Sequence, residues 1–292
     1  MVKYCVAKYP KGSFPGQQTD GKYADSYLYD NIKILSETIT NDMTFLGVLF
    51  SSTLEVGTGK STLAQQIAEM YTEQVNQIHG LNLTFTKENI VFKPKDLVER
   101  SLKLPKYSCI ILDEWEDAHY WSELGTSLRK FFRKCRQLNL FMIIIIPDFF
   151  QLPIGYAISR SVFGIDVRFE GKFERGFFRF YNYDKKKDLY IKGKKMHDYG
   201  VVQSNFFGRF PHGYAIPEDE YRYIKMRDLK EAEEDDRLPT EKEIKADTCK
   251  KLKANNPKLT NRELGLSFGV SERTINRWLH DEKDDEEGDV VL

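Results

Sequence analysis

Residues 54–62 read LEVGTGKST, and two segments with different hydrophobic patterns flank them. The preceding residues 43–50 (MTFLGVLF) are rich in apolar side chains, as expected for a buried strand. The following residues 61–71 (STLAQQIAEMY) repeat apolar side chains at the spacing of an amphipathic helix. A glycine-rich turn between a strand and a helix is the context in which GKS predicts a phosphate-binding P-loop.

The residue types of this loop suit phosphate binding. Gly57 and Gly59 allow backbone N–H groups to curve around phosphate oxygens, and the following helix adds the positive end of its dipole. Lys60 is placed to contact the β- and γ-phosphates, and the Ser61 hydroxyl to coordinate Mg²⁺. The sequence therefore predicts ATP and Mg²⁺ as cofactors. The predicted nucleotide-binding residues are Glu55, Val56, Gly57, Thr58, Gly59, Lys60, Ser61 and Thr62.

One position departs from the P-loop pattern. The pattern places its first glycine where this chain has Leu54. We expect this bulky residue to shift the entry of the loop or to strain its backbone. The alternative interpretation of the whole stretch is a glycine turn that binds nothing.

A second predicted site element follows about fifty residues later. Residues 107–112 (YSCIIL) are mostly apolar, and Asp113 and Glu114 come directly after them. Carboxylates at the end of a buried parallel strand emerge at the edge where open α/β sheets bind ligands. We predict that Asp113 holds Mg²⁺ through water and that Glu114 polarises the attacking water. Alone, this pattern describes any strand that leaves the core; downstream of a P-loop it favours nucleotide hydrolysis over binding alone.

The rest of the first 215 residues alternates between strand and helix patterns. The expected elements are a short N-terminal strand, a helix over 24–38, strands at 81–85 and 90–92, helices over 94–103 and 115–136, a strand at 140–146 and an antiparallel hairpin at a sheet edge over 162–183. Such alternation predicts an α/β fold with a mostly parallel, RecA-like sheet. The expected domains are a P-loop ATPase domain (1–215), an acidic linker (216–239), a helix-turn-helix domain (240–283) and an acidic tail (284–292).

A separate motif lies in residues 258–279, KLTNRELGLSFGVSERTINRWL. Thr260 and Glu263 form a capping-box pattern, and Gly269 supplies the conformation that a tight turn needs. Ser271 then caps a second helix, and residues 241–255 supply a supporting first helix. These spacings predict a helix-turn-helix, of which the alternative is a helical hairpin for protein contacts.

The second helix of this motif carries side-chain types that read DNA. Arginine and asparagine pair in a bidentate manner with guanine and adenine edges in the major groove. The inward positions are Ile275, Trp278 and Leu279. The predicted DNA-binding residues are Arg273, Thr274, Asn276 and Arg277.

Composition limits the other classes of protein. The net charge is zero, so affinity for nucleic acid must come from local patches. One such patch is the lysine cluster of residues 184–195 (DKKKDLYIKGKK), either a basic hairpin on phosphates or a solvated turn. Four scattered cysteines show no metal-binding spacing, and no apolar run nears the ~18–20 residues of a membrane span. We expect a cytoplasmic protein without a membrane segment.

The interval after Asp113 and Glu114 resembles a known family. A long helical stretch leads to RQLNL (136–140), then to an apolar strand, and then to PDFFQ (147–151). Over residues 43–180 this resembles the HerA/FtsK superfamily, and within it the zonular occludens toxin-like ATPases of filamentous phages, archaeal viruses and mobile plasmids. The resemblance implies homo-oligomeric rings that pump DNA, a polar sensor residue and an arginine supplied between subunits.

The residues for these roles follow from the resemblance alone. The sensor is Asp148 or Gln151, since the chain has Pro147 and Asp148 where the family often has glutamine. The arginine is one of Arg129, Arg133, Arg136 and Arg160, with Arg136 taken as catalytic together with Lys60 and Glu114. The leading function is an ATP-driven DNA motor or DNA packaging or transfer ATPase. The alternative is a nucleotide-switched DNA-binding regulator, or a replication or partition loading factor.

Overall fold

The structure, a computed structural model, describes residues 4–7, 22–55, 57–113, 129–132, 135–171, 173–236 and 241–280. The chain divides into two units, residues 1–228 and residues 229–292. The division falls inside the stretch that the sequence predicts as a linker. Most of that stretch is a helix, α7 (Glu218–Asp236).

One mixed sheet organises the first unit, with the strand order β4-β5-β6-β3-β7-β8-β9. Its strands are β3 (Phe45–Phe50), β4 (Ile90–Val91), β5 (Cys109–Leu112), β6 (Phe141–Ile145), β7 (Ser161–Glu170), β8 (Glu174–Tyr181) and β9 (Phe206–Arg209). The pairs from β4 to β7 are parallel, whereas β8 is antiparallel to both β7 and β9. This confirms the prediction of an α/β fold with a mostly parallel sheet.

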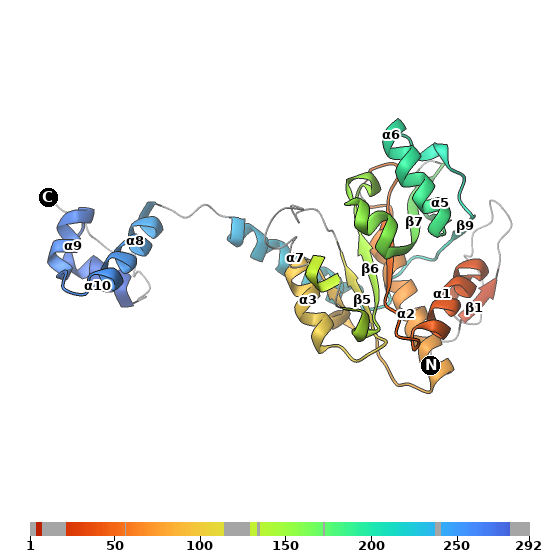
Figure 1. The fold of residues 1–292 in the computed structure, drawn as a ribbon, viewed down its shortest axis with the longest axis horizontal. Helices are drawn as coiled ribbons and strands as arrows, with labels where there is room; N and C mark the ends of the chain where they lie inside the picture. The colour runs from red at the N-terminus through yellow and green to blue at the C-terminus, as the bar shows by residue number, and fades with distance from the viewer. Residues whose placement is uncertain are drawn as a thin grey trace. The chain divides into compact units, whose positions relative to one another are not determined.

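The central strands are continuously apolar because both faces of the sheet are covered. Every residue of β3, β5 and β6 is buried. On one face, α1 (Ser26–Thr38) and α2 (Lys60–His79) pack over alternate strand residues such as Leu49. On the other face, Val48 and Phe50 belong to a second buried cluster, together with Leu97 of α3 (Pro94–Lys103) and residues of the helical segments between β6 and β9 (Figure 1). A buried parallel sheet of this kind needs such cover on both sides.

Short helical segments make up most of the second cover. They are η2 (Cys135–Leu138), η3 (Phe149–Gln151), η4 (Gly155–Arg160), α5 (Tyr183–Asp188), η5 (Leu189–Gly193), α6 (Lys194–Met196) and η6 (Tyr199–Val201). A further turn, η1 (Lys87–Asn89), precedes β4, and β1 (Tyr4–Ala7) pairs in parallel with β2 (Lys22–Asp25). Among the described residues, no helix combines the length and the apolar character needed to cross a membrane.

Several predicted elements are confirmed and others are wrong. The helices at 24–38 and 94–103 and the strands at 90–92 and 140–146 appear within one or two residues of their predicted bounds. Residues 81–85 form no strand, and β9 was not predicted. The hairpin of β7 and β8 exists, but it does not form the sheet edge because β9 pairs with β8. Most of the predicted helix at 115–136 lies outside the described residues.

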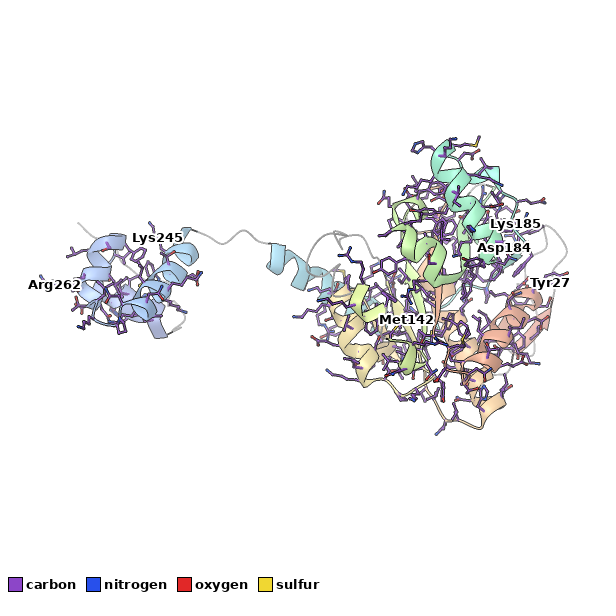
Figure 2. All side chains as sticks on the ribbon, viewed as in Figure 1. Tyr27, Met142, Asp184, Lys185, Lys245 and Arg262 are labelled. Carbon is purple, nitrogen blue, oxygen red and sulfur yellow. The ribbon has the colours of Figure 1, made fainter. Side chains whose placement is uncertain are left out.

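The lysine cluster is helical rather than a hairpin or a turn, and all of its lysines except Lys186 are exposed. Residues 183–196 are helical, through α5, η5 and α6. Asp184 and Lys185 are exposed at the start of α5 (Figure 2), but Lys186 is fully buried. Its Nζ donates hydrogen bonds to the carbonyl oxygens of Ala157 and Ser161, at 2.6 and 2.7 Å. This lysine therefore closes the end of η4 rather than contributing to a surface patch.

Beyond the end of α7, the described part of the second unit contains three helices. They are α8 (Glu241–Asn255), α9 (Asn261–Phe268) and α10 (Glu272–His280). Thr260 caps α9 with the predicted capping box to Glu263, and Gly269 ends that helix at φ 68°. Leu264, Ile275 and Trp278 are buried together with Cys249 of α8.

Candidate nucleotide site

The glycine-rich loop, residues 54–62, connects the carboxyl end of β3 to the start of α2. Gly57 and Gly59 have φ values of 81° and 98°, which residues that carry a side chain rarely adopt. Gly59 is also the residue before the first turn of α2, and its carbonyl oxygen accepts a hydrogen bond from the Leu63 N–H at 3.0 Å. The loop therefore turns its backbone toward the N-terminus of a 20-residue helix, where the helix dipole favours anions.

Leu54 has the strained backbone that its departure from the P-loop pattern predicts. Its φ is 56°, in the left-handed region, and its side chain is 58% exposed. Its N–H donates to the carbonyl oxygen of Ser51 at 3.2 Å, so a turn opens the loop. A left-handed non-glycine residue costs roughly 1–2 kcal/mol. The exposed side chain does not offset this cost by packing into the core.

A buried carboxylate anchors the start of the loop. Asp166 of β7 accepts hydrogen bonds from the Ser52 N–H at 2.7 Å and from the Ser52 hydroxyl at 2.8 Å. Asp166 is 1% exposed, and burial raises its pKa, although the bonds from Ser52 and the nearby arginines oppose the rise. The sequence analysis missed this residue. The available signal was an acid inside the apolar run VFGIDVRF.

Asp113 meets the glycine-rich loop at the carboxyl ends of the strands. The Ser61 hydroxyl donates to Asp113 Oδ1 at 3.1 Å, across 52 positions of sequence. Strand β6 lies between β3 and β5, so both residues border the same edge of the sheet. Asp113 is 1% exposed, and its N–H donates to the carbonyl oxygen of Val91 at 2.9 Å. The structure thus brings together the two predicted metal-binding residues; Glu114 and Val56 lie outside the described residues.

These groups line a cavity of about 490 Å³. It includes Lys60 and the buried Thr58, whose hydroxyl has no hydrogen-bond partner within the described part of the chain. The guanidinium of Arg175, the second residue of β8, lies 3.3 Å from the place where a Cβ on Gly57 would stand. The remaining lining includes Leu54, Glu55, Ser61, Thr62, Pro147, Phe210, His212, Tyr214, Glu218, Tyr221, Arg222 and Lys225.

The far wall of this cavity comes from residues 210–225, which the sequence analysis did not assign to the site. The Phe210 ring stands 3.1 Å from a Cβ built on Gly59, so only glycine fits there without displacing the ring. Gln66 of α2 donates to the carbonyl oxygens of Pro211 and Gly213, both at 2.8 Å. Two hydrogen bonds from one side chain thus hold this segment against the helix that follows the loop.

Tyr221 of α7 completes the surroundings of Asp113. Its hydroxyl donates to Asp113 Oδ2 at 2.5 Å, and its side chain is 3% exposed. Burial, and then the negative charge of Asp113, raise the pKa of Tyr221 well above its ordinary value. The phenol therefore remains a proton donor at neutral pH. No sequence signal links these residues, since 108 positions separate them.

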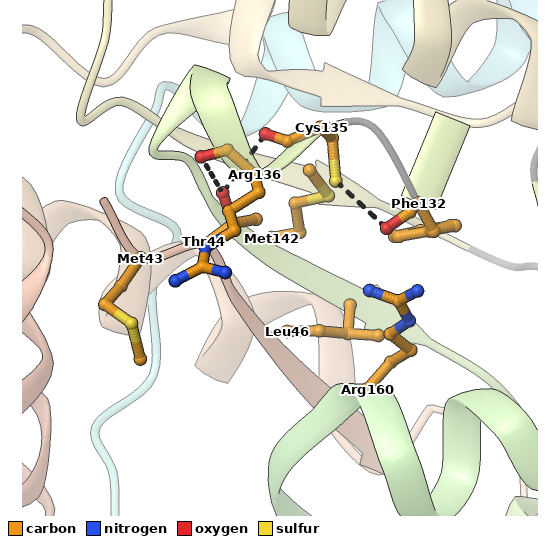
Figure 3. A pocket seen from close by; sticks show the side chains of 8 residues that line it. All are labelled: Met43, Thr44, Leu46, Phe132, Cys135, Arg136, Met142 and Arg160. Atoms are coloured by element: carbon orange, nitrogen blue, oxygen red, sulfur yellow. Dashed lines mark hydrogen bonds between the residues drawn. The ribbon is translucent and has the colours of Figure 1, made fainter. Parts of the chain in front are cut away.

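Arg136 lies elsewhere, at the opposite end of β3. Its Nε donates to the carbonyl oxygen of Asp42 at 3.1 Å. Together with Arg160 it lines a pocket of about 230 Å³ beside Met43, which precedes β3, and Leu46 of that strand. The two guanidinium groups approach this pocket from different segments (Figure 3). Within one chain, Arg136 does not reach the glycine-rich loop.

The candidate sensor residues do not line the cavity beside the glycine-rich loop. Asp148 accepts hydrogen bonds from the Tyr199 hydroxyl at 2.6 Å and from the Phe150 N–H at 2.9 Å. Gln151 belongs to the short helix η3. Of residues 147–151, all of which the structure describes, only Pro147 borders the cavity. Arg129 begins the described piece 129–132, and Arg133 lies outside the described residues.

The four predicted DNA-binding residues all lie on α10, but they differ in exposure. Arg273 and Asn276 are exposed, whereas Thr274 and Arg277 are half-buried. The Thr274 N–H donates to the Ser271 hydroxyl at 3.2 Å, so Thr274 forms part of the helix cap. The Asn276 amide oxygen accepts a hydrogen bond from Asn261 of α9.

Comparison of the chain with family models, with curated proteins and with solved structures finds no match.

Proposed function

We propose that the chain is an ATP-hydrolysing DNA motor, or a DNA packaging or transfer ATPase, whose second unit recruits it to DNA. The observation that carries this proposal is the hydrogen bond between Ser61 and Asp113 at the carboxyl edge of a parallel sheet. A glycine loop, a lysine, a hydroxyl and a buried carboxylate around one cavity are the parts that phosphoryl transfer from ATP requires. A RecA-like P-loop fold agrees with the strand order.

The residues of the cavity fit a nucleotide with its cation. Lys60 and Arg175 bring positive charge to the phosphates, and the Thr58 hydroxyl gains a partner there. Ser61 and Asp113 offer the oxygen ligands that Mg²⁺ prefers. Mg²⁺ held by these residues would supply positive charge against the negative charge that develops on the phosphates. Glu114, which follows Asp113 in the chain, accepts the proton of the attacking water in this proposal.

The proposed DNA contacts come from α10, treated as the recognition helix of a helix-turn-helix. The tight turn at Gly269 and the exposed side chains of Arg273 and Asn276 support this assignment. A ring of copies gives Arg136 a role as well. Because it lies at the far end of β3, it would act on the nucleotide of a neighbouring copy.

The decisive measurement is the ATPase rate of the full chain without DNA, with long double-stranded DNA and with single-stranded DNA. A motor shows strong stimulation by long DNA of any sequence. The nucleotide-switched regulator instead shows slow hydrolysis and sequence-specific binding that depends on the nucleotide. The matched variant is Glu114→Gln, which should keep ATP binding and lose turnover, because an amide is a poor proton acceptor.

The DNA-binding assignment has its own test. Replacing Arg273 and Arg277 with alanine should cost about 1–3 kcal/mol at a specific site for each base-contacting arginine. Arg262, exposed on α9 (Figure 2), is the matched control. Titrations against a specific and a random duplex at fixed salt separate base contacts from phosphate contacts. Unchanged affinity for both duplexes assigns this unit to protein contacts.

A further inference from the structure

Both oxygens of the Asp113 carboxylate accept hydrogen bonds from residues that lie far apart in sequence. Ser61, from the glycine-rich loop, donates to Oδ1. Tyr221, from α7, donates to Oδ2. The Ser61 contact belongs to the proposed nucleotide site. The Tyr221 contact has no part in that mechanism.

Tyr221 is held in place by its neighbours rather than by the hydrogen bond alone. Its ring lies 4.7 Å from the Tyr214 ring and 6.3 Å from the Phe92 ring, measured between centroids. Tyr214 follows directly after the segment that Gln66 fixes against α2. The hydroxyl therefore reaches Asp113 from a segment that is built onto the wall of the cavity.

The hydrogen bond is of the strong, charge-assisted kind. Its donor is a phenolic hydroxyl, which ordinarily keeps its proton at neutral pH, and its acceptor is a carboxylate. The partners are 1% and 3% exposed, so water does not replace either of them readily. A phenol that donates to a carboxylate in a buried site withdraws electron density from the oxygen that a cation or its water shell needs.

We propose that Tyr221 is a positioning residue that holds Asp113 while the cation is absent and releases Oδ2 when a divalent cation binds with the nucleotide. This inference rests on the proposed function. Its consequence is a movement of the first turns of α7. Glu218, Arg222 and Lys225 of the same turns also line the cavity, so their position changes with that of Tyr221.

The matched pair of variants is Tyr221→Phe and Tyr223→Phe. Tyr223 lies on the same helix, is 69% exposed and does not line the cavity. Binding of Mn²⁺ to the full chain is measured by electron paramagnetic resonance at saturating ADP. Removing the competing hydroxyl should tighten Mn²⁺ binding in Tyr221→Phe by about tenfold, the effect of one hydrogen bond to a charged group. Tyr223→Phe should match the parent.

A second measurement follows the backbone of α7 instead of the affinity for the cation. Hydrogen exchange at the backbone amides of residues 218–225 should accelerate when Mn²⁺ and ADP are added to the parent chain. In Tyr221→Phe the exchange should be fast before any addition.

The outcomes separate this inference from the proposed function. If the parent binds ADP and Mn²⁺ but Tyr221→Phe binds Mn²⁺ equally or more weakly, the nucleotide site stands and the role of Tyr221 as a competitor is rejected. Unchanged exchange on ligand addition rejects the movement of α7. A parent chain that binds neither ADP nor Mn²⁺ overturns the nucleotide site and the inference with it.

Discussion

The two ends of β3 carry different kinds of surroundings, although the same apolar strand joins them. At its carboxyl end, hydrogen bonds link the glycine-rich loop to Asp113, to Asp166 and, through Asp113, to Tyr221. At its amino end, the pocket with Arg136 and Arg160 is lined mainly by apolar side chains, and Arg136 bonds to a backbone carbonyl. The two ends of β3 therefore differ in how many segments, distant from one another in sequence, contact the residues that lie there.

The largest expected effect comes from removing a charge at the carboxyl end. Lys60→Ala should abolish measurable ATP binding while leaving the fold intact, because Lys60 lines the phosphate cavity at the start of α2. Two charge-assisted contacts at about 1.5–3 kcal/mol each amount to a loss of more than about 100-fold. Nucleotide binding is measured by calorimetry.

The matched control removes a charge from the other end. Arg136→Ala should bind ATP as the parent does, since its guanidinium lies beyond the start of β3. An equal loss of ATP affinity in both variants would mean that the amino end of β3 contributes to nucleotide binding as much as the carboxyl end does. Loss of hydrolysis without loss of binding in Arg136→Ala would support a contact between neighbouring copies.

Sequence patterns predicted the strands and the loop because their signals are local. The continuous apolar runs of β5 and β6 and the capping box at Thr260 depend only on neighbouring positions. Arg175 and Tyr221 carry no such signal, since the sheet order and the return of the chain over α2 bring them to the loop. Asp166 is marked only as an acid inside an apolar run, and that pattern does not show that it bonds to Ser52.

The lysine cluster was misread for a related reason. A run of lysines looks solvated in sequence, whereas burial against η4 lowers the pKa of Lys186 to about 7. Residues 81–85 form no strand, and the backbone N–H and carbonyl oxygen of Leu83 instead bond to the side chain of Asn76 on α2, both at 2.8 Å.

A smaller effect is expected from Arg175→Ala. Its guanidinium lies beside Gly57, where it adds to the positive charge that Lys60 provides. We expect ATP affinity to fall by about tenfold, the effect of one charge-assisted contact that is partly exposed to water. Arg160→Ala, at the amino end of β3, is the control with the same change of charge. An unchanged affinity in Arg175→Ala would remove this arginine from the phosphate site.

Asp166→Asn tests the anchor through its dependence on pH. The folded state raises the pKa of Asp166, so protons bind more readily to the folded chain than to the unfolded chain. The stability of the parent should therefore decline as the pH rises from below the ordinary carboxyl range through the raised pKa. The asparagine variant should lack that part of the decline. Urea unfolding at several pH values measures the free energy of unfolding of both proteins. If this free energy depends on pH in the same way in both, the raised pKa of Asp166 is contradicted.

The smallest effect is expected from Leu54→Gly, which changes the entry to the loop. Glycine relieves the left-handed backbone of Leu54, a gain of roughly 1–2 kcal/mol. It also gives the unfolded chain more freedom, which costs about 0.5–1 kcal/mol. The exposed leucine side chain contributes little packing to lose, so the net change in stability should stay within about 1 kcal/mol. Hydrolysis should be equal or faster, because the backbone no longer resists the turn that presents its N–H groups to phosphate. A large loss of ATPase rate would mean that the Leu54 side chain itself contacts the nucleotide at the mouth of the cavity.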